Sequence, residues 1–447
     1  MKVTINFHDR KVRTILKQLF QAGLQAADPI LAMKKALSVK GSMLRVGRRQ
    51  YDLTQYDRIV CVGGGKASGM MAIALEQRLG SRLSGGFVAV KDHSGCKTKY
   101  IRVVETGHPV PDGRSVRAAK EIFTLAQSLT RRDLLVVLVS GGASSLLAAP
   151  ASGLTLADKK HITTLLLRSG ATIQEINTVR KHLSAIKGGQ LAAATSATIV
   201  SLVLSDVLGD DLATIGSGPT APDPTTFQDA RGILKKFQLW PRVSMAVRVH
   251  LEKGIDGHIA DTPKTQAAEF ARVHHAIIGN NRLTVDAIAK QAKGLGLHPL
   301  VLTTTLEGEA QEIGKMIGAM AKEIQSSGQP VQRPACLVWG GEPTVTVKGK
   351  GKGGRAQELV LSAAIQIAGL PNMCVAGFGT DGSDGQTDMA GAIVDGLTIE
   401  RALKKHVDPW EALDHNNSYS FFKKIGGHIH TGTTGTNVND VYVLLAL

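Results

Sequence analysis

The sequence contains little of what marks metal-binding, secreted or base-stacking proteins. Its 447 residues include only 4 cysteines, which lie far apart in the chain. Zinc sites and disulfide frameworks need cysteines at short, regular spacings, so neither is expected. Aromatic residues make up 4% of the chain, which leaves few side chains for stacking against nucleic-acid bases.

Long apolar stretches are also absent from the sequence. The longest runs, such as residues 134–139 and 199–204, have the length of a strand, whereas a membrane-spanning helix needs about 20 apolar residues. Residues 1–13 carry charges throughout and contain no apolar segment of the kind that forms the centre of a secretory signal. We therefore predict no membrane association and a cytoplasmic location.

Basic residues exceed acidic ones. Lys and Arg number 53 against 37 Asp and Glu, which gives a formal net charge of +16 at pH 7. Such an excess attracts anionic ligands, either small molecules or nucleic acid. The basic residues are scattered along the chain instead of forming a stripe or tail, so we expect a small anionic ligand. A non-catalytic protein that binds anions or nucleic acid is the alternative.

The pattern of apolar runs predicts an α/β protein. Short runs rich in Val, Ile and Leu alternate with helical stretches and glycine-rich turns, an order typical of βαβ units with a parallel sheet covered on both faces. In the first half of the chain the expected strands are residues 58–62, 86–90, 101–105, 134–140 and 198–204. In the second half they are residues 276–278, 300–303, 336–339, 344–347, 373–377 and 441–445.

A polar segment separates these two regions. Residues 251–272 are rich in polar side chains and contain Gly254, Gly257 and Pro263, which disfavour regular structure. We therefore predict two domains, residues 1–255 and residues 270–447. A chain of this length is sufficient for two domains that each bury a core of their own.

The most informative segment is a glycine-rich turn at the end of the first expected strand, where Gly63, Gly64 and Gly65 directly precede Lys66. Glycine lets backbone N–H groups approach an anion, a following helix offers its positive N-terminus, and the lysine adds a mobile charge. The spacing fits neither the P-loop nor the dinucleotide-binding motif, which has a glycine where Ser68 stands. The alternative interpretation is a plain strand-to-helix turn.

Two later turns that follow expected strands also carry candidate ligands. After residues 134–140, the backbone of Gly141 and Gly142 and the hydroxyl of Ser144 can donate hydrogen bonds to an anion. After residues 198–204 come several carboxylates, among them Asp206 and Asp211. Magnesium prefers one or two carboxylates together with water and phosphate oxygens, so these two are candidate Mg²⁺ ligands. Helix capping by aspartate is the alternative.

Basic residues at two places suggest contacts with a substrate. If residues 177–190 are helical, Arg180, Ser184 and Lys187 share one face that could bind a carboxylate or simply meet solvent. Arg355 stands where a helix is expected to begin, a position at which the helix dipole disfavours positive charge, so a functional reason gains weight. The Lys- and Gly-rich segment 348–354 just before it is either a flexible loop or a lid over a nucleotide.

The second half of the chain adds polar groups in glycine-rich turns. Glu342 follows the expected strand at 336–339, and the turn after 373–377 contains Asp381, Gly382 and Asp384. A further loop of glycines and hydroxyl residues at 431–439 contains Asn437. Because ligands of open α/β sheets bind beyond the carboxyl ends of strands, we expect these residues near the binding site.

Taken in order along the chain, these segments resemble the glycerate 2-kinase family. The N-terminal part of that family is matched by residues 63–68 (Gly-Gly-Gly-Lys-Ala-Ser), 140–144, 177–184, 205–210 and 216–220. Its C-terminal MOFRL domain, named as a multi-organism fragment rich in leucine, is matched by residues 340–345, 354–358 (Gly-Arg-Ala-Gln-Glu), 379–385 and 431–440. The match covers nearly the whole chain, and the joint order of the motifs is far more specific than any one of them.

The resemblance implies a fold and a reaction. The fold is two three-layer α/β/α domains, the first Rossmann-like with a mainly parallel sheet and the second with a mixed sheet, with the active site in the cleft between them. The reaction is phosphorylation of D-glycerate at its C2 hydroxyl by ATP with Mg²⁺, which gives 2-phosphoglycerate and ADP. The expected partners are D-glycerate and a nucleotide, without nucleic acid or membrane, and a homodimer is left open.

The resemblance also assigns roles to residues. It implies that Lys66 and Arg355 are catalytic, one on the transferring phosphate and the other on the developing charge or the glycerate carboxylate. We expect Asp206 to accept the hydroxyl proton, with Asp381 and Asp384 competing for Mg²⁺ or the nucleotide. The remaining residues expected to bind substrate or nucleotide are Gly64, Gly65, Ser68, Gly141, Gly142, Ser144, Arg180, Lys187, Glu342, Gly382 and Asn437.

A reductase is the rival enzyme class. Proteins of this family have also been labelled hydroxypyruvate reductases, and a glycine-rich loop after the first strand superficially suits NAD(P)H. The missing glycine at Ser68, and the lack of a well-placed acidic residue at the end of a second strand to bind the ribose hydroxyls, favour the kinase.

Overall fold

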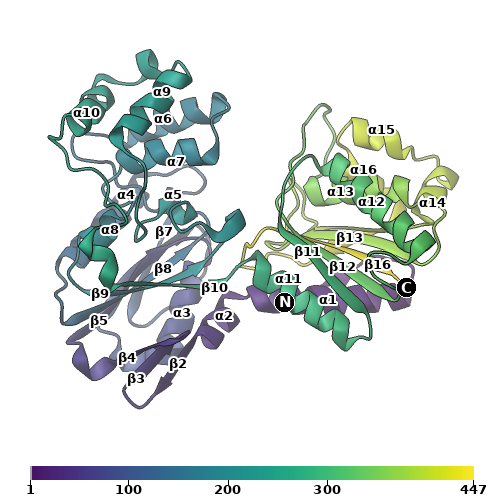
Figure 1. Cartoon of the computed structure of the whole chain (residues 1–447), viewed down its shortest axis with the longest axis horizontal. Coiled ribbons are helices and arrows are strands. Elements are labelled where there is room, and N and C mark those ends of the chain that lie inside the picture. Colours follow the sequence, from purple (N-terminus) through teal and green to yellow (C-terminus); the bar gives the residue numbers. More distant parts are fainter. Residues whose placement is uncertain (1–2) are drawn as a thin grey trace. The chain divides into compact units, whose positions relative to one another are not determined.

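Two large β-sheets organise the chain in a computed structural model that describes residues 3–447 (Figure 1). The contacts divide the chain into Ala32–Ile278, here called the parallel-sheet unit, and a mixed-sheet unit that joins Met1–Leu31 to Gly279–Leu447. The sequence pattern predicts that the first 31 residues are part of the N-terminal domain. The structure assigns this segment to the other unit, because the apolar face of its helix packs there.

The parallel-sheet unit contains a six-stranded sheet with the order β10-β9-β8-β5-β6-β7. Strands β5 to β9 pair in parallel. The strands of this unit are β2 (Leu37–Lys40), β3 (Met43–Val46), β4 (Arg49–Asp52), β5 (Arg58–Gly64), β6 (Gly85–Lys91), β7 (Ile101–Thr106), β8 (Asp133–Ser140), β9 (Thr198–Leu204) and β10 (Val273–Gly279), of which β2 to β4 form a separate antiparallel meander. The helices are α2 (Pro29–Ala36), α3 (Ser68–Leu79), α4 (Gly113–Gln127), α5 (Ala143–Leu146), α6 (Leu156–Arg168), α7 (Ile173–His182), α8 (Gln190–Ala193), α9 (Phe227–Lys236) and α10 (Met245–Ile255).

The central strand β8 shows why the sequence forms this sheet. All of its residues are buried, and six of them form the continuous run Leu-Leu-Val-Val-Leu-Val that is typical of a strand covered on both faces. It lies between β5 and β9, with which it pairs in parallel. Because parallel strands point the same way, the carboxyl ends of β5, β8 and β9 lie at one edge of the sheet.

Four helices of this unit form a cluster with its own apolar core. Helices α6, α7, α9 and α10 bury residues such as Leu166, Val179, Leu234 and Val247 against one another (Figure 1). Each of α6, α7 and α9 begins with a capping box, in which a threonine and an acidic residue three positions later satisfy each other's backbone N–H groups. The helix starts are therefore encoded locally, while the cluster itself depends on contacts between helices.

The mixed-sheet unit is built on a seven-stranded sheet with the order β1-β15-β14-β13-β16-β12-β11. Strands β11 and β12 are parallel, and the other pairs are antiparallel. Its elements are β1 (Thr4–Ile5), α1 (Arg10–Ala27), α11 (Asn281–Gly294), β11 (His298–Leu306), α12 (Ala310–Ser327), β12 (Ala335–Gly341), α13 (Arg355–Gln366), β13 (Met373–Gly379), β14 (Gly391–Asp395), α14 (Thr398–Lys404), α15 (Pro409–Asp414), α16 (Ser418–Ile425), β15 (His428–His430) and β16 (Asp440–Ala446).

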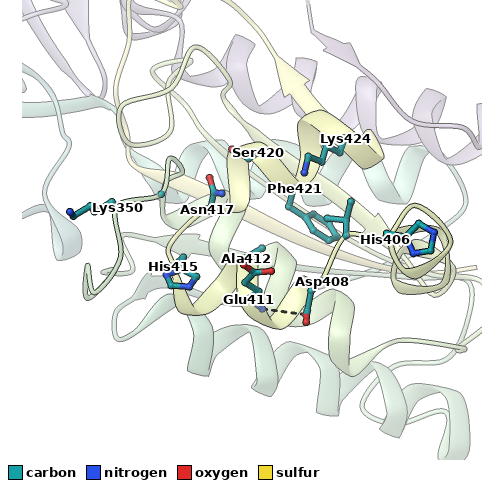
Figure 2. Close-up of a pocket in the computed structure, with 12 residues that line it drawn as sticks. Lys350, His406, Asp408, Glu411, Ala412, His415, Asn417, Ser420, Phe421 and Lys424 are labelled. Atoms are coloured by element: carbon teal, nitrogen blue, oxygen red, sulfur yellow. Dashed lines mark hydrogen bonds between the residues drawn. The ribbon is translucent and has the colours of Figure 1, made fainter.

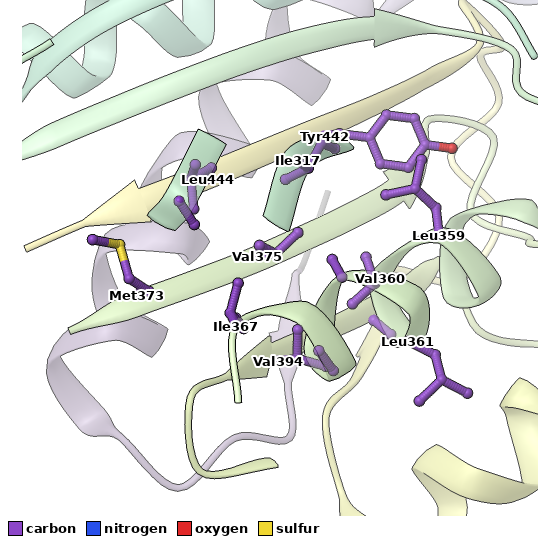
Figure 3. Close-up of a cluster of buried hydrophobic side chains, with 14 of the residues drawn as sticks. Ile317, Leu359, Val360, Leu361, Ile367, Met373, Val375, Val394, Tyr442 and Leu444 are labelled. Carbon is purple, nitrogen blue, oxygen red and sulfur yellow. The ribbon is translucent and has the colours of Figure 1, made fainter. Parts of the chain in front are cut away.

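Helices cover both faces of this sheet. On one face, Leu359 of α13 packs in the same buried cluster as Val375 of β13 and Leu444 of β16 (Figure 3). On the other face, Phe20 of α1 packs on Phe378 of β13, with 4.4 Å between the ring centroids. The unit therefore has three layers, and α1 supplies part of the third.

One predicted strand is wrong. Residues 344–347 form no strand, and only Thr344 pairs, as an isolated bridge to Glu309. The Glu309 carboxylate instead accepts hydrogen bonds from the backbone N–H and the hydroxyl of Thr346. Because these polar groups bond to a side chain and Val347 is exposed, the β-rich sequence becomes a loop.

Residues 276–278, expected in the second domain, instead lie in β10 at the edge of the first sheet, whose unit extends to Ile278. The α/β class, the parallel first sheet and the mixed second sheet are confirmed. Among the described residues, every helix falls short of the length and apolar character that a bilayer crossing requires.

The packing of α1 yields a test of the observed division into units. Replacing the fully buried Phe20 by Ala should lower the unfolding free energy of the mixed-sheet unit by about 3–5 kcal/mol, since a large side chain is removed from a filled core. Urea unfolding monitored by the fluorescence of Trp339 and Trp410, which belong to that unit, measures the change. The exposed neighbour Lys17→Ala is the control. A midpoint equal to that of the control would show that α1 does not support this unit.

Candidate active site

Several residues predicted to form the site lie together at the carboxyl ends of β5, β8 and β9. The backbone N–H of Lys66 donates to the carbonyl of Gly141 at 2.8 Å. Asp206, which follows β9, lies against the same turn, since a Cβ atom on Gly141 would be 2.0 Å from its Oδ2. Gly142 has a left-handed conformation with φ of 85°, and a Cβ there would be 3.3 Å from Cγ of Lys66. The turn thus joins a lysine and a carboxylate that lie far apart in the sequence.

A histidine that no sequence motif marked lies beside this turn. A Cβ on Gly142 would be 3.0 Å from the His108 ring. Burial, with a further contribution from the nearby Lys66 and Lys91, lowers the pKa of His108 to about 4, so the ring is neutral at pH 7. Its position just beyond β7, at the same edge as the glycine-rich turns, is the sequence signal that could have identified it.

Two serines near this edge stabilise the turn itself. The Ser140 hydroxyl accepts a hydrogen bond from the backbone N–H of Ala67 at 3.0 Å and lies 3.2 Å from the Ser68 hydroxyl. Both serines are buried. A Cβ on Gly65 would meet the Ser140 hydroxyl at 2.1 Å, so glycine is required for this close approach. The structure therefore gives Ser68 a structural role, and its predicted contact with a ligand stays a prediction.

The predicted magnesium ligands differ in their surroundings. Both carboxylate oxygens of Asp211 accept hydrogen bonds locally, one from the backbone N–H of Ala213 and one from the hydroxyl of Thr214. Asp211 thus stabilises its own turn, and its contact with a metal ion stays a prediction. Within residues 3–447 no group of three His, Cys, Asp or Glu side chains could hold a metal ion. The single carboxylate of Asp206 suits a Mg²⁺ ion whose other ligands are phosphate oxygens and water.

Ser144 belongs to a polar network next to the turn. Its hydroxyl is 3.0 Å from that of Ser217, which donates to Asn177 at 3.1 Å. The ammonium group of Lys187 donates to the Ser144 carbonyl at 2.9 Å and to its hydroxyl at 3.2 Å. Lys187 is buried, and burial lowers its pKa well below the usual value. The predicted anion-binding residues Ser144 and Lys187 are therefore in direct contact.

The predicted helical face is wrong in its geometry. Helix α7 ends at His182, and Ser184 instead forms an isolated bridge with Pro150. The hydroxyl of Ser184 donates to Ala149 at 3.0 Å, so it belongs to the turn that follows the helix. Arg180 and Lys187 are nonetheless close enough for Arg180 to lower the pKa of Lys187.

In the mixed-sheet unit, Arg355 forms ion pairs with two carboxylates. Its Nε donates to Oδ2 of Asp440 at 2.5 Å, and its Nη1 donates to Oε1 of Glu342 at 2.7 Å. Asp440, which was not among the residues expected from the sequence, is buried and also accepts from the hydroxyl of Tyr442. Burial raises the pKa of the Asp440 carboxyl to about 7, although the Arg355 charge opposes that shift. These acidic partners offset the unfavourable position of a cation at the start of α13.

The two predicted aspartates of the turn after β13 have different roles. The Asp384 carboxylate accepts hydrogen bonds from the backbone N–H groups of Ala356 and Gln357 at 3.0 and 2.8 Å. It thereby caps α13, whose own cap residue, Gly354, has no side chain. Asp381 is partly exposed, and its Oδ1 accepts from the backbone and hydroxyl of Ser383. A ligand contact by either aspartate stays a prediction.

The residues around Arg355 line a pocket of about 770 Å³. Its walls include Arg355, Asp381, Asp384 and most of the Lys- and Gly-rich segment 348–354. Asn437 and Gly382, in contrast, lie in neighbouring turns: the Asn437 side chain accepts from the backbone N–H of Asn439, and a Cβ on Gly382 would meet the carbonyl of Gly432 at 1.9 Å.

The loop 348–354 is bound to its surroundings along its length. The side-chain oxygen of Asn416 accepts from the backbone N–H groups of Lys348 and Gly349, at 2.7 and 3.0 Å. Its amide group donates to the buried Glu358 of α13. The other side of the same loop borders a cavity of about 380 Å³ lined by Lys350, His415 and Asn417 (Figure 2). The loop is thus a positioned wall of the larger pocket.

Both units of the chain are similar to known proteins. Residues 15–252 match the model of a domain of unknown function, DUF4147, and residues 335–440 match the MOFRL family. A glycerate 2-kinase from Pyrococcus horikoshii is 42% identical over 435 residues, which are 97% of each chain. A putative hydroxypyruvate reductase from Agrobacterium vitis is 39% identical over 445 residues, 99% of this chain and 96% of that protein. The crystal structure of glycerate kinase from Thermotoga maritima matches with a TM-score of 0.88 at 37% identity, over 98% of this chain and 100% of that one.

The capping role of Asp384 can be tested by its effect on stability. The Asp384→Ala change leaves two buried N–H groups of α13 without an acceptor, so the unfolding free energy should fall by about 2 kcal/mol or more. The matched control Asp381→Ala should stay within about 0.5 kcal/mol of the original protein, because that side chain is partly exposed. Chemical unfolding of both variants measures the difference, and equal stability of the two would contradict the capping role.

Proposed function

The chain belongs to the glycerate 2-kinase family, and we propose that it transfers the γ-phosphoryl group of ATP to the C2 hydroxyl of D-glycerate, giving 2-phosphoglycerate and ADP. The meeting of Lys66, the Gly141 and Gly142 backbone and Asp206 at one sheet edge carries this proposal. Phosphoryl transfer depends mainly on positioning and on neutralising charge, and these groups supply both.

Lys66 contacts the transferring phosphoryl group in this proposal. Its backbone is held by Gly141, so its side chain starts from a fixed point, and the left-handed turn at Gly142 brings backbone and lysine side chain together. His108 beside it is neutral, so it can exchange hydrogen bonds with the substrate without adding a further positive charge.

Asp206 accepts the proton of the C2 hydroxyl. Its carboxylate lies against the turn at Gly141, where a substrate hydroxyl would be within reach of both the base and the phosphoryl group. The same carboxylate suits Mg²⁺, so the two roles compete for its oxygens. When bound, Mg²⁺ supplies charge neutralisation to the phosphate oxygens.

Arg355 stabilises the developing negative charge or binds the glycerate carboxylate. Two carboxylates orient its guanidinium. Asp440 accepts from Nε at 2.5 Å and from Nη2 at 3.2 Å, and Glu342 accepts from Nη1 at 2.7 Å. A guanidinium has five N–H donors, so donors are left for a ligand. Its place on the wall of the 770 Å³ pocket makes it accessible to a substrate.

The reaction itself is tested by phosphorus NMR. Incubating the purified protein with ATP, Mg²⁺ and D-glycerate should produce the signal of 2-phosphoglycerate, which is distinct from those of 3-phosphoglycerate and inorganic phosphate. The 3-isomer would keep the kinase but overturn the assigned hydroxyl. If no phosphate is transferred, and hydroxypyruvate is instead reduced with NADH, the reductase is the correct class.

The two catalytic assignments predict large losses of turnover. Lys66→Ala and Arg355→Ala should each lower kcat by about 10²-fold or more, the scale of one lost electrostatic contact in a transition state, with the fold intact. The exposed residues Lys120 and Arg333 offer matched controls, whose change to Ala should leave kcat unchanged. Steady-state assays with circular dichroism as the folding control make the comparison. Near-normal turnover in either variant would remove that residue from the mechanism.

A further inference from the structure

Three basic residues come from α6, from the last turn of α7 and from the segment that follows α7. Lys159 of α6 donates from its ammonium group to the carbonyl of Leu183, the residue after α7, at 2.9 Å. Arg180 lies in the last turn of α7. Lys187 follows the helix and donates to the carbonyl and hydroxyl of Ser144. We refer to Lys159, Arg180 and Lys187 as the three-cation cluster.

The two lysines of this cluster are buried beside other cations. Only 9% of Lys159 and 2% of Lys187 is exposed. Burial first, and then the neighbouring Arg180, lowers the pKa of Lys159 to about 7, and the pKa of Lys187 is lowered by burial, Lys159 and Arg180. Among the described residues, every charged group that shifts the pKa of these two lysines is therefore another cation. Such an arrangement is unfavourable unless an anion joins it.

Neighbouring cations of the same region show the contrast. Lys181, which comes directly after Arg180, forms a buried ion pair with Asp223 at 3.2 Å. His182 forms a contact of 2.9 Å with Asp261. The fold thus provides carboxylates for these two basic residues, while Lys159 and Lys187 donate to carbonyl and hydroxyl oxygens of Leu183 and Ser144.

The cluster has hydrogen-bond donors left for a ligand. An ammonium group has three donors, of which Lys159 uses one and Lys187 two in the contacts above. Arg180 is partly exposed. Because the lysines are almost fully buried, they suit a small anionic group better than a whole nucleotide.

We propose that Lys159, Arg180 and Lys187 bind the carboxylate group of the acid substrate, with Ser144 linking this site to the phosphoryl-transfer turn at Gly141 and Gly142. The proposal rests on the function proposed above for the substrate it names, and of the two roles given there to Arg355 it leaves the developing negative charge. A carboxylate and a phosphate share the chemistry that the cluster recognises, and the two are distinguished by experiment. The lysine of α6, Lys159, thereby enters the site although no sequence motif marked it.

Two variants and two matched controls test the site. Lys187→Met and Arg180→Gln remove one charge each, while Lys160→Met and Arg168→Gln change the same residue types at positions outside the cluster. The KM for D-glycerate should rise about 10- to 100-fold in the cluster variants, the effect of losing one charge-assisted hydrogen bond, and the KM for ATP should stay unchanged. Arg180→Lys, which keeps the charge, should restore part of the affinity.

Ligand-induced thermal stabilisation provides a readout that does not need catalysis. D-Glycerate should raise the melting temperature of the original protein and of both controls. The rise should be much smaller in the cluster variants. If the protein transfers no phosphate but D-glycerate still stabilises it through the cluster, the site holds and the proposed function fails. If the kinase is active and the cluster variants keep their KM for D-glycerate, the site fails and the function holds.

The remaining outcomes also decide the assignment. A rise in the KM for ATP alone, or stabilisation by ATP and inorganic phosphate but not by D-glycerate, would assign the cluster to phosphate and overturn the carboxylate site. If Lys187→Met does not fold by circular dichroism, the partly exposed Arg180 carries the test. Unchanged D-glycerate binding in Arg180→Gln would then show that the cluster only stabilises the end of α7.

Discussion

The close parallel pairing of β5 with β8 is the constraint on which the parallel-sheet unit depends. A Cβ on Gly63 would be 2.1 Å from the carbonyl of Leu138, and one on Gly65 would be equally close to the Ser140 hydroxyl. Only glycine permits this distance between the strands. The pairing in turn aligns Lys66 with Gly141, and the neighbouring strand β9 brings Asp206 to the same turn. The geometry of the backbone therefore brings Lys66, Gly141 and Asp206 together at this edge.

The basic residues of the candidate sites differ in how their charge is offset. In the mixed-sheet unit, Arg355 is paired with Asp440 and Glu342, so its charge is offset and its orientation is set before any ligand binds. In the parallel-sheet unit, Lys159 and Lys187 are buried next to other cations, which lower the pKa of both ammonium groups. The paired guanidinium is oriented in advance, whereas the attraction of an anion by the lysines belongs to the site inferred above.

Some expectations from the sequence failed for a common reason. Residues 344–347 have the composition of a strand, yet Glu309 binds Thr346 and the segment forms a loop. Ser184 fits a helical spacing with Arg180, yet α7 ends at His182 and Ser184 pairs with Pro150. In each case a contact with a distant residue replaced the local pattern, and local periodicity carries no information about such contacts.

Runs and motifs within a few neighbouring residues were enough to predict the α/β class, most of the large strands, the glycine-rich turns at their ends and the family. Lys66, Asp206 and Arg355 were recognisable for that reason. Other features emerged only in three dimensions: α1 packs on the second sheet, His108 lies beside Gly142, Asp440 pairs with Arg355, and Lys159 and Lys187 are buried in one cluster. Burial and long-range pairing arise from the packing of distant segments, and they set both the charge and the orientation of the side chains on which the proposed function depends.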